Sequence, residues 1–160
     1  MDPETPTDMC PDEAPREPVG LKRRLPGETI LVVDDELMVL ALTRDILVGE
    51  GYQVLEAPGG EDALRIAEGH AGAIHLLLTD VVMPEINGRQ LADRLRRIRR
   101  ETKVLFMSAF TTELLADYEV MSGDPLITKP FSVADLTHKV REILGYRSPF
   151  ARPGREGGRR

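Results

Sequence analysis

The stretch that decides the fold reads Thr29-Ile30-Leu31-Val32-Val33-Asp34-Asp35. Its first five residues are mostly apolar and β-branched, which is typical of a strand buried on both faces. Two aspartates follow directly. Residues 36–49 then predict a helix, because the apolar segment is long enough for one and glycines at 49 and 51 end it.

The same alternation recurs four more times along the chain. Strands are predicted at 52–57, 74–78, 103–107 and 126–128, and helices at about 60–68, 88–100, 112–121 and 132–144. Such alternation predicts an α/β fold, with a parallel sheet, helices on both faces and right-handed crossovers. The runs at 30–33 and 74–78 read as central strands, and the more polar 52–57 as an edge strand.

Three helices carry an apolar stripe that we expect to pack on the sheet. The stripes are Leu91, Leu95 and Ile98; Leu114, Tyr118 and Met121; and Val133, Leu136, Val140, Ile143 and Leu144. Ser132 and Asp135 form a predicted capping box at the start of the last helix, where Phe131 can pack onto Leu136.

The 160 residues suit one domain. Residues 1–28 hold six of the twelve prolines and seven acidic residues against four basic ones, which predicts a disordered acidic leader. Residues 145–160 carry five arginines and one glutamate and predict a disordered basic tail. The domain is therefore expected at 29–144, where 19 acidic residues outnumber 12 basic ones.

Composition argues against several classes of function. The net charge of −6 does not favour nucleic-acid binding, and the arginines at 89–100 read as a solvated helix face. No apolar run approaches the length of a membrane span, and the N-terminus does not resemble a secretory signal. Cys10 is the single cysteine, and the three histidines lack ligand spacing. We expect a cytoplasmic protein without nucleic-acid or membrane partners.

Polar side chains follow four of the predicted strands. Asp34 and Asp35 end the first, Asp80 the third, Ser108 the fourth and Lys129 the fifth. The carboxyl ends of parallel strands meet at one edge, where α/β proteins place their chemistry. An Asp-Asp pair by itself more often only caps a helix, so the joint placement carries the argument.

Three ionised carboxylates in one pocket repel strongly. Either one takes up a proton or a divalent cation lies among them. We favour Mg²⁺, because it prefers hard oxygen ligands and a protonated aspartate could not act as a nucleophile. A carboxylate can attack phosphorus to give an acyl phosphate, and Asp80 is the natural nucleophile because its strand should be central.

The motifs Val32-Val33-Asp34-Asp35-Glu36, Asp80-Val81-Val82-Met83-Pro84 with Asn87-Gly88, Ser108-Ala109 and Lys129-Pro130-Phe131 stand in order at the strand ends. Over residues 29–144 the chain resembles the receiver domain of two-component response regulators, and most of all the receivers of hybrid histidine kinases. The resemblance implies a flavodoxin-like three-layer sandwich of five helices and a five-stranded sheet in the order 2-1-3-4-5.

The resemblance also implies roles for single residues. Asp80 would be the phosphoacceptor, with Lys129 and Ser108 binding the phosphoryl group and a cis peptide between Lys129 and Pro130. Asp35, Asp80 and the main-chain oxygen of Val82 would hold Mg²⁺, with Asp34 acting largely through water. A sensor histidine kinase or a histidine phosphotransfer protein would be the donor.

Two positions depart from the family pattern. Leu126 stands where the family often has an aromatic residue that switches rotamer, which questions the usual coupling to Ser108. Val82 and Phe110 are apolar where a polar side chain could orient water, so we expect slow self-dephosphorylation.

We therefore expect a signalling module rather than an enzyme, one that catalyses its own phosphorylation and slow dephosphorylation within a phosphorelay. No DNA-binding output is visible. A downstream protein or a second copy would bind the surface formed by residues 112–144. Two alternatives remain open: an aspartate-nucleophile phosphatase, although its usual Asp-x-Asp pattern is absent at Asp34, and a degenerate receiver that serves only as a scaffold.

Overall fold

A computed structural model describes residues 28–110, 112–121 and 123–145. Apart from residues 28 and 145, the predicted leader and tail lie outside the described residues, and so does Cys10. In the described part of the chain, no helix combines the length and the apolar composition that a membrane span requires.

Five parallel strands form one sheet in the order β2-β1-β3-β4-β5, as predicted. They are β1 (Thr29–Val33), β2 (Gln53–Ala57), β3 (Leu76–Asp80), β4 (Lys103–Ser108) and β5 (Leu126–Thr128). The prediction of β2 as an edge strand is confirmed, and every residue of β1 and β3 is buried. Because all pairs are parallel, the five carboxyl ends lie along one edge.

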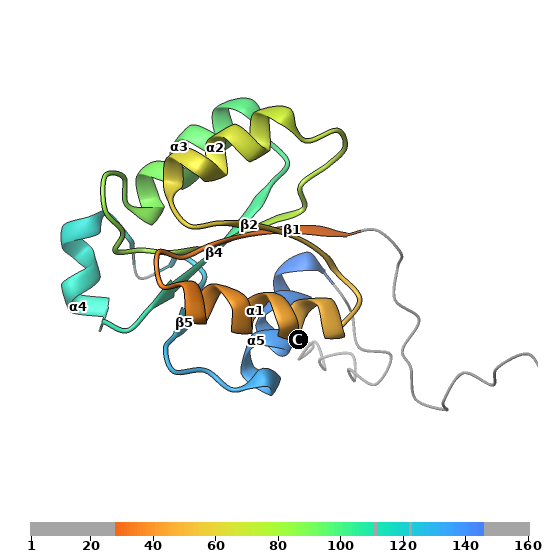
Figure 1. Cartoon of the computed structure of the whole chain (residues 1–160). Coiled ribbons are helices and arrows are strands. Elements are labelled where there is room, and N and C mark those ends of the chain that lie inside the picture. The colour runs from red at the N-terminus through yellow and green to blue at the C-terminus, as the bar shows by residue number, and fades with distance from the viewer. Residues whose placement is uncertain (1–27, 111, 122, 146–160) are drawn as a thin grey trace, which may run out of the picture.

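Helices cover both faces of the sheet, which gives three layers (Figure 1). The helical elements are α1 (Leu37–Gly49), α2 (Gly60–Gly69), α3 (Gly88–Ile98), α4 (Thr112–Leu115), the 3-10 turn η1 (Ala116–Tyr118) and α5 (Val133–Leu144). α2 and α3 lie on one face and α1 and α5 on the other (Figure 1). Alternate strand residues feed two cores: Leu77 packs with Leu91 and Leu95 of α3, and Leu76 with Leu136 of α5.

β3 begins and ends two residues later than the predicted strand 74–78. The imidazole of His75 accepts a hydrogen bond at Nδ1 from the Thr29 backbone N–H (2.9 Å), and Thr102 Oγ1 donates to the Ile74 carbonyl (2.7 Å). At this entry His75 keeps backbone hydrogen bonds to Thr29 and Lys103, and side chains supply the further partners of the Thr29 N–H and the Ile74 carbonyl. The shift makes Asp80 the last residue of β3.

α3 ends two residues before the predicted boundary at 100. Arg99 leaves the helix and donates to the carbonyl oxygens at the end of α2 and in the loop after it, those of Ala67 (2.9 Å), His70 (2.6 Å) and Gly72 (2.6 Å). Those carbonyls lack partners within α2, so Arg99 completes the hydrogen bonding of a neighbouring helix. Sequence periodicity carries no signal for such a contact.

The helix predicted at 112–121 is wrong in its length and in its buried face. α4 lasts four residues, η1 follows, and Glu119 adopts a left-handed conformation with φ 59°. Leu114 and Met121 of the predicted stripe are exposed, and Leu115 and Val120 are buried instead. Tyr118, the third stripe position, is half-buried and packs against the core as predicted.

Two further stripe positions are corrected, because Ile98 and Val133 are exposed. Ala92 takes a buried position on α3 that the sequence stripe had not included. At the start of α5, the predicted capping box of Ser132 and Asp135 is confirmed in both hydrogen bonds.

Candidate functional site

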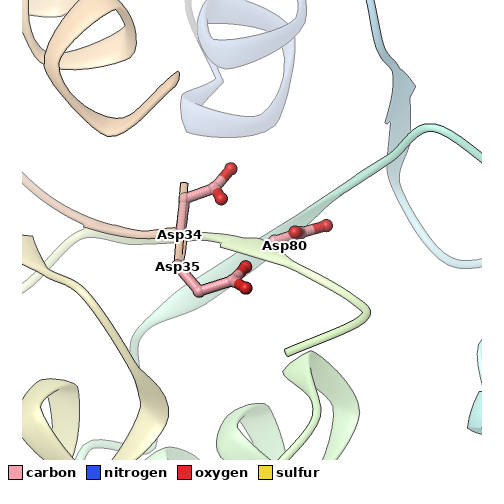
Figure 2. Close-up of side chains that lie close together, drawn as sticks. All are labelled: Asp34, Asp35 and Asp80. Atoms are coloured by element: carbon pink, nitrogen blue, oxygen red, sulfur yellow. The ribbon is translucent and has the colours of Figure 1, made fainter. Parts of the chain in front are cut away.

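Three aspartates meet at the carboxyl edge of the two central strands. Asp34 and Asp35 follow β1, and Asp80 ends the neighbouring strand β3, where Val33 pairs with Thr79. One carboxylate oxygen from each lies within 4.8 Å of the others, and the three side chains gather at the strand ends in Figure 2. Asp34 and Asp80 are buried and Asp35 is exposed, so the cluster opens to solvent on one side.

Both oxygens of Asp34 already accept hydrogen bonds. The Glu36 backbone N–H donates to Oδ1 (2.9 Å), and Lys129 Nζ donates to Oδ2 (2.7 Å). The first bond shapes the turn into α1, whose own N-cap residue Glu36 makes no side-chain cap. The interpretation of the Asp-Asp pair as a helix cap is thus partly right for Asp34. Asp35 and Asp80 keep carboxylate oxygens that face the cluster.

Lys129 brings the one ammonium of the cluster from the far edge of the sheet. It follows β5, its backbone N–H donates to the Ser108 carbonyl (2.8 Å), and its peptide bond to Pro130 is cis, as the resemblance implied. Nζ lies 3.5 Å from Asp80 Oδ2, farther than from Asp34. Burial lowers the pKa of Lys129, but the hydrogen bond to Asp34 and the charge of Asp80 outweigh it, so its pKa lies above the ordinary value.

Burial raises the pKa of Asp80 to about 6, with added contributions from the negative charges of Asp34 and Asp35. Lys129 acts in the opposite direction and keeps the pKa from rising further. At neutral pH the carboxylate is still mostly ionised, which a nucleophile requires. A bound cation would offset the negative charges of Asp34 and Asp35, the two groups that hinder the ionisation of Asp80.

Ser108 ends β4, one residue beyond Met107, the partner of Asp80 in the sheet. It is buried, and its Oγ accepts a hydrogen bond from the Phe110 backbone N–H (3.0 Å). The sequence predicted Ser108 at this edge but carried no signal for this local bond. Phe110, two residues after Ser108, is 46% exposed, and Val82, two residues after Asp80, is half-buried.

Leu126 begins β5, opposite Phe106 of β4. It is half-buried and packs against the core on the side of α2 and α3. A branched aliphatic side chain therefore fills this place, and no aromatic ring is available here to change rotamer.

The donor set suits a divalent cation. Its ligands are carboxylate oxygens without imidazole or thiolate, and within the described residues this is the one such group. Mg²⁺ prefers ligands of this kind and keeps several waters, which the open side beside Asp35 allows.

The chain belongs to the response regulator receiver domain family. The family model for this domain matches residues 30–141, which takes in every strand described above. The fold, the sheet order and the motifs at the strand ends thus define a receiver domain of two-component systems, and the predicted resemblance is confirmed.

Known relatives share this region. The chain is 35% identical over 117 residues to the sensor kinase CckA of Brucella abortus, covering 72% of this chain and 12% of that protein. It is 34% identical over 131 residues to the alkaline phosphatase synthesis transcriptional regulatory protein PhoP of Bacillus subtilis, covering 81% of this chain and 53% of the relative. The chain thus spans at most about half of these relatives.

Solved receiver structures superpose over nearly their whole length. The receiver domain from the hybrid histidine kinase CckA has a TM-score of 0.62 and 37% identity, covering 72% of this chain and 98% of its own. The response regulator TrrA of Thermotoga maritima, solved in complex with Mg(2+)-BeF, has a TM-score of 0.63 and 30% identity with the same coverage.

Proposed function

We propose that Asp80 accepts a phosphoryl group from a phosphohistidine of a partner protein, either a sensor histidine kinase or a histidine phosphotransfer protein. One observation carries the proposal. Asp80 ends the central strand, lies 3.5 Å from the ammonium of Lys129 and shares a 4.8 Å cluster with Asp34 and Asp35. The family supports it, since receivers are signalling modules.

In the transfer, one carboxylate oxygen of Asp80 attacks phosphorus and forms an acyl phosphate. The N–P bond of the donor breaks, and its electron pair stays on the imidazole of the partner. Lys129 is placed to hold one phosphoryl oxygen. Ser108 holds another once its Oγ turns from the Phe110 N–H and donates its own proton.

We assign Mg²⁺ to Asp35, Asp80 and the main-chain oxygen of Val82. Asp34 acts through water, because its two oxygens already accept from Glu36 and Lys129. When bound, the ion supplies neutralisation of negative charge on the carboxylates and on the phosphoryl oxygens. The residues of this chain bind and orient the reacting groups.

Exposed apolar side chains border the cluster and offer a surface for the donor. Leu37, Met38 and Leu42 lie in the first two turns of α1 and are 66%, 87% and 58% exposed. A donor that brings phosphorus in line with Asp80 must contact the surface around it, and covering these apolar side chains removes them from water, which favours association. The output would use the surface of α4, β5 and α5, within residues 112–144.

The proposal includes slow loss of the phosphoryl group. Val82 and Phe110 border the site with apolar side chains, so neither can orient an attacking water. The acyl phosphate would persist until another protein or spontaneous hydrolysis removes it.

The test is incubation of the full chain with Mg²⁺ and acetyl phosphate, followed by intact-mass and peptide mass spectrometry. We expect one phosphoryl adduct on the peptide that contains Asp80. The adduct should be absent in Asp80→Ala and retained in Asp62→Ala, a control that removes an exposed aspartate of α2. Turnover of the donor without an adduct would indicate a phosphatase, and neither adduct nor turnover would indicate a scaffold.

A further inference from the structure

Arg89 and Asp124 form an ion pair that joins α3 to the turn before β5. Arg89 Nη1 donates to Asp124 Oδ2 at 3.2 Å, and the same oxygen accepts from the Met121 backbone N–H at 2.8 Å. Each side chain of the pair is 24% exposed, less than most other ion pairs of the described surface. The carboxylate thus closes its own turn and is held by a helix 35 residues earlier in the chain.

The arginine end of this pair is fixed to the backbone that carries Asp80. Arg89 follows Gly88, whose N–H donates to the Val81 carbonyl at 2.8 Å. A Cβ on Gly88 would lie 2.2 Å from the Asp80 carbonyl oxygen, so α3 starts in direct contact with the chain of the phosphoacceptor. Arg89 therefore reaches the turn from a position that has little freedom to shift.

Asp124, the other end of the pair, follows an irregular segment formed by α4 and η1. α4 has one turn, η1 follows, and Glu119 leaves it in a left-handed conformation. Leu114 and Met121 are exposed, so fewer apolar side chains of this segment hold it to the core. Segments of this kind open at low free-energy cost, so even a modest contribution from one ion pair changes how often they open.

We propose that the Arg89–Asp124 ion pair is a latch that holds the region from α4 to β5 against α3. Phosphorylation of Asp80 moves Ser108 toward the phosphoryl group, and Ser108 lies just before this region. The region can rearrange only when the ion pair breaks. The role in signalling rests on the function proposed above. The mechanical part does not, because it concerns only how firmly the pair ties the turn before β5 to α3.

The test is hydrogen exchange with mass spectrometry on the full chain, without metal or phosphodonor. In Arg89→Gln, peptides from residues 112–128 should exchange about three- to tenfold faster, whereas the rest of the domain is unchanged. The matched control is Arg94→Gln, which removes a pair of α3 with Glu61 of α2 at 3.1 Å that does not reach the turn.

A second variant tests the pairing itself. Asp124→Asn keeps an oxygen for the Met121 N–H but removes the charge, so it should reproduce the effect of Arg89→Gln, and the double variant should add little. Equal exchange in Arg89→Gln and Arg94→Gln, a uniform rise over the domain, or fully additive effects in the double variant would each overturn the latch.

A final arm separates this inference from the proposed function. With Mg²⁺ and beryllium fluoride, exchange of 112–128 should change in the wild type and change less in Arg89→Gln, where the latch is already open. Equal changes in both proteins would overturn the latch as the element that phosphorylation releases. No change in either protein, with the Arg89→Gln effect intact, would count against phosphoryl binding and leave the mechanical latch supported.

Discussion

The two ends of the strands differ in how their buried polar groups are paired. At the amino ends of the strands, each polar group described above has at least one hydrogen-bond partner. Thr102 donates to the Ile74 carbonyl, His75 accepts from Thr29, and Arg99 donates to three carbonyls of α2 and its loop. These bonds hold the framework together, and at this end of the strands Glu28 Oε2, just before β1, is buried without a hydrogen-bond partner.

The carboxyl edge leaves its charges unbalanced. Asp34, Asp35 and Asp80 share the single ammonium of Lys129, and the pKa of Asp80 is raised to about 6 by burial and by the other two carboxylates. The comparison shows that the same sheet places its stabilising contacts at one edge. At the other it keeps an excess of negative charge that is unfavourable until a cation binds.

The largest effect is expected from removing the ammonium at the carboxyl edge. Lys129→Met keeps the length of the side chain but loses the charge that faces Asp80 and Asp34. Phosphorylation by acetyl phosphate should slow about a hundredfold, because a positioned charge is lost where negative charge develops. Adduct formation followed over time by intact mass measures the rate. Lys139→Met, on the exposed side of α5, is the control and should leave it unchanged.

At the amino edge, Arg99→Ala should lower the free energy of unfolding by about 2 kcal/mol, because three carbonyls lose a charged donor at once. Urea titration measures the change. Arg97→Ala removes an exposed arginine of α3 and should change stability by less than about 0.5 kcal/mol. If the two substitutions lowered stability equally, the hydrogen bonds of Arg99 would not be a special stabilising contact at the amino ends of the strands.

The pH dependence of the free energy of unfolding tests the raised pKa of Asp80. Its pKa is about 6 in the fold and 3.8 as the ordinary value, so the folded state binds the extra proton between these values. Its contribution to stability is complete below pH 3.8 and is lost as pH rises through 6. Asp80→Asn should therefore gain stability relative to wild type from pH 4 to 7, reaching about 1–2 kcal/mol without Mg²⁺.

Urea unfolding at several pH values in the presence of a chelator checks this expectation. Asp117→Asn, at an exposed site of η1, should run parallel to wild type over the same range. A difference between Asp80→Asn and wild type that shrinks as pH rises would contradict the raised pKa.

The smallest effect concerns the apolar border of the site. In Val82→Asn an amide replaces a half-buried valine beside Asp80 and can orient water, so the acyl phosphate should be lost about fivefold to tenfold faster. Decay of the adduct after removal of the donor gives the rate. A wild-type half-life of seconds that Val82→Asn does not change would show that these side chains do not exclude water.

Prediction from sequence succeeded where one short run of residues carries the whole signal. The buried strands at the centre of the sheet, the edge position of β2 and the capping box at Ser132 follow from local apolar content and local hydrogen bonding. The meeting of Asp34, Asp80 and Lys129 also followed, because parallel strands must bring their carboxyl ends to one edge.

It failed where a distant residue decides the outcome. The end of α3 depends on carbonyls of α2 that Arg99 reaches, and the start of β3 depends on a bond between His75 and Thr29. The face of α4 was wrong because a turn of 3-10 helix changes the period, a change that the apolar residues themselves do not reveal.

Taken alone, the amino-acid order determined the α/β class, the order of the elements and the set of polar residues at the functional edge, since each depends on neighbours within a few positions. Only the tertiary structure decided how those residues divide their contacts. Asp34 is committed to Glu36 and Lys129, Ser108 to Phe110, and Arg89 to Asp124. Two of these contacts, Lys129 with Asp34 and Arg89 with Asp124, join segments far apart in the chain and exist only once the strands and helices have packed. The bonds of Asp34 with Glu36 and of Ser108 with Phe110 span two residues each, and the backbone conformation after β1 and β4 decides them.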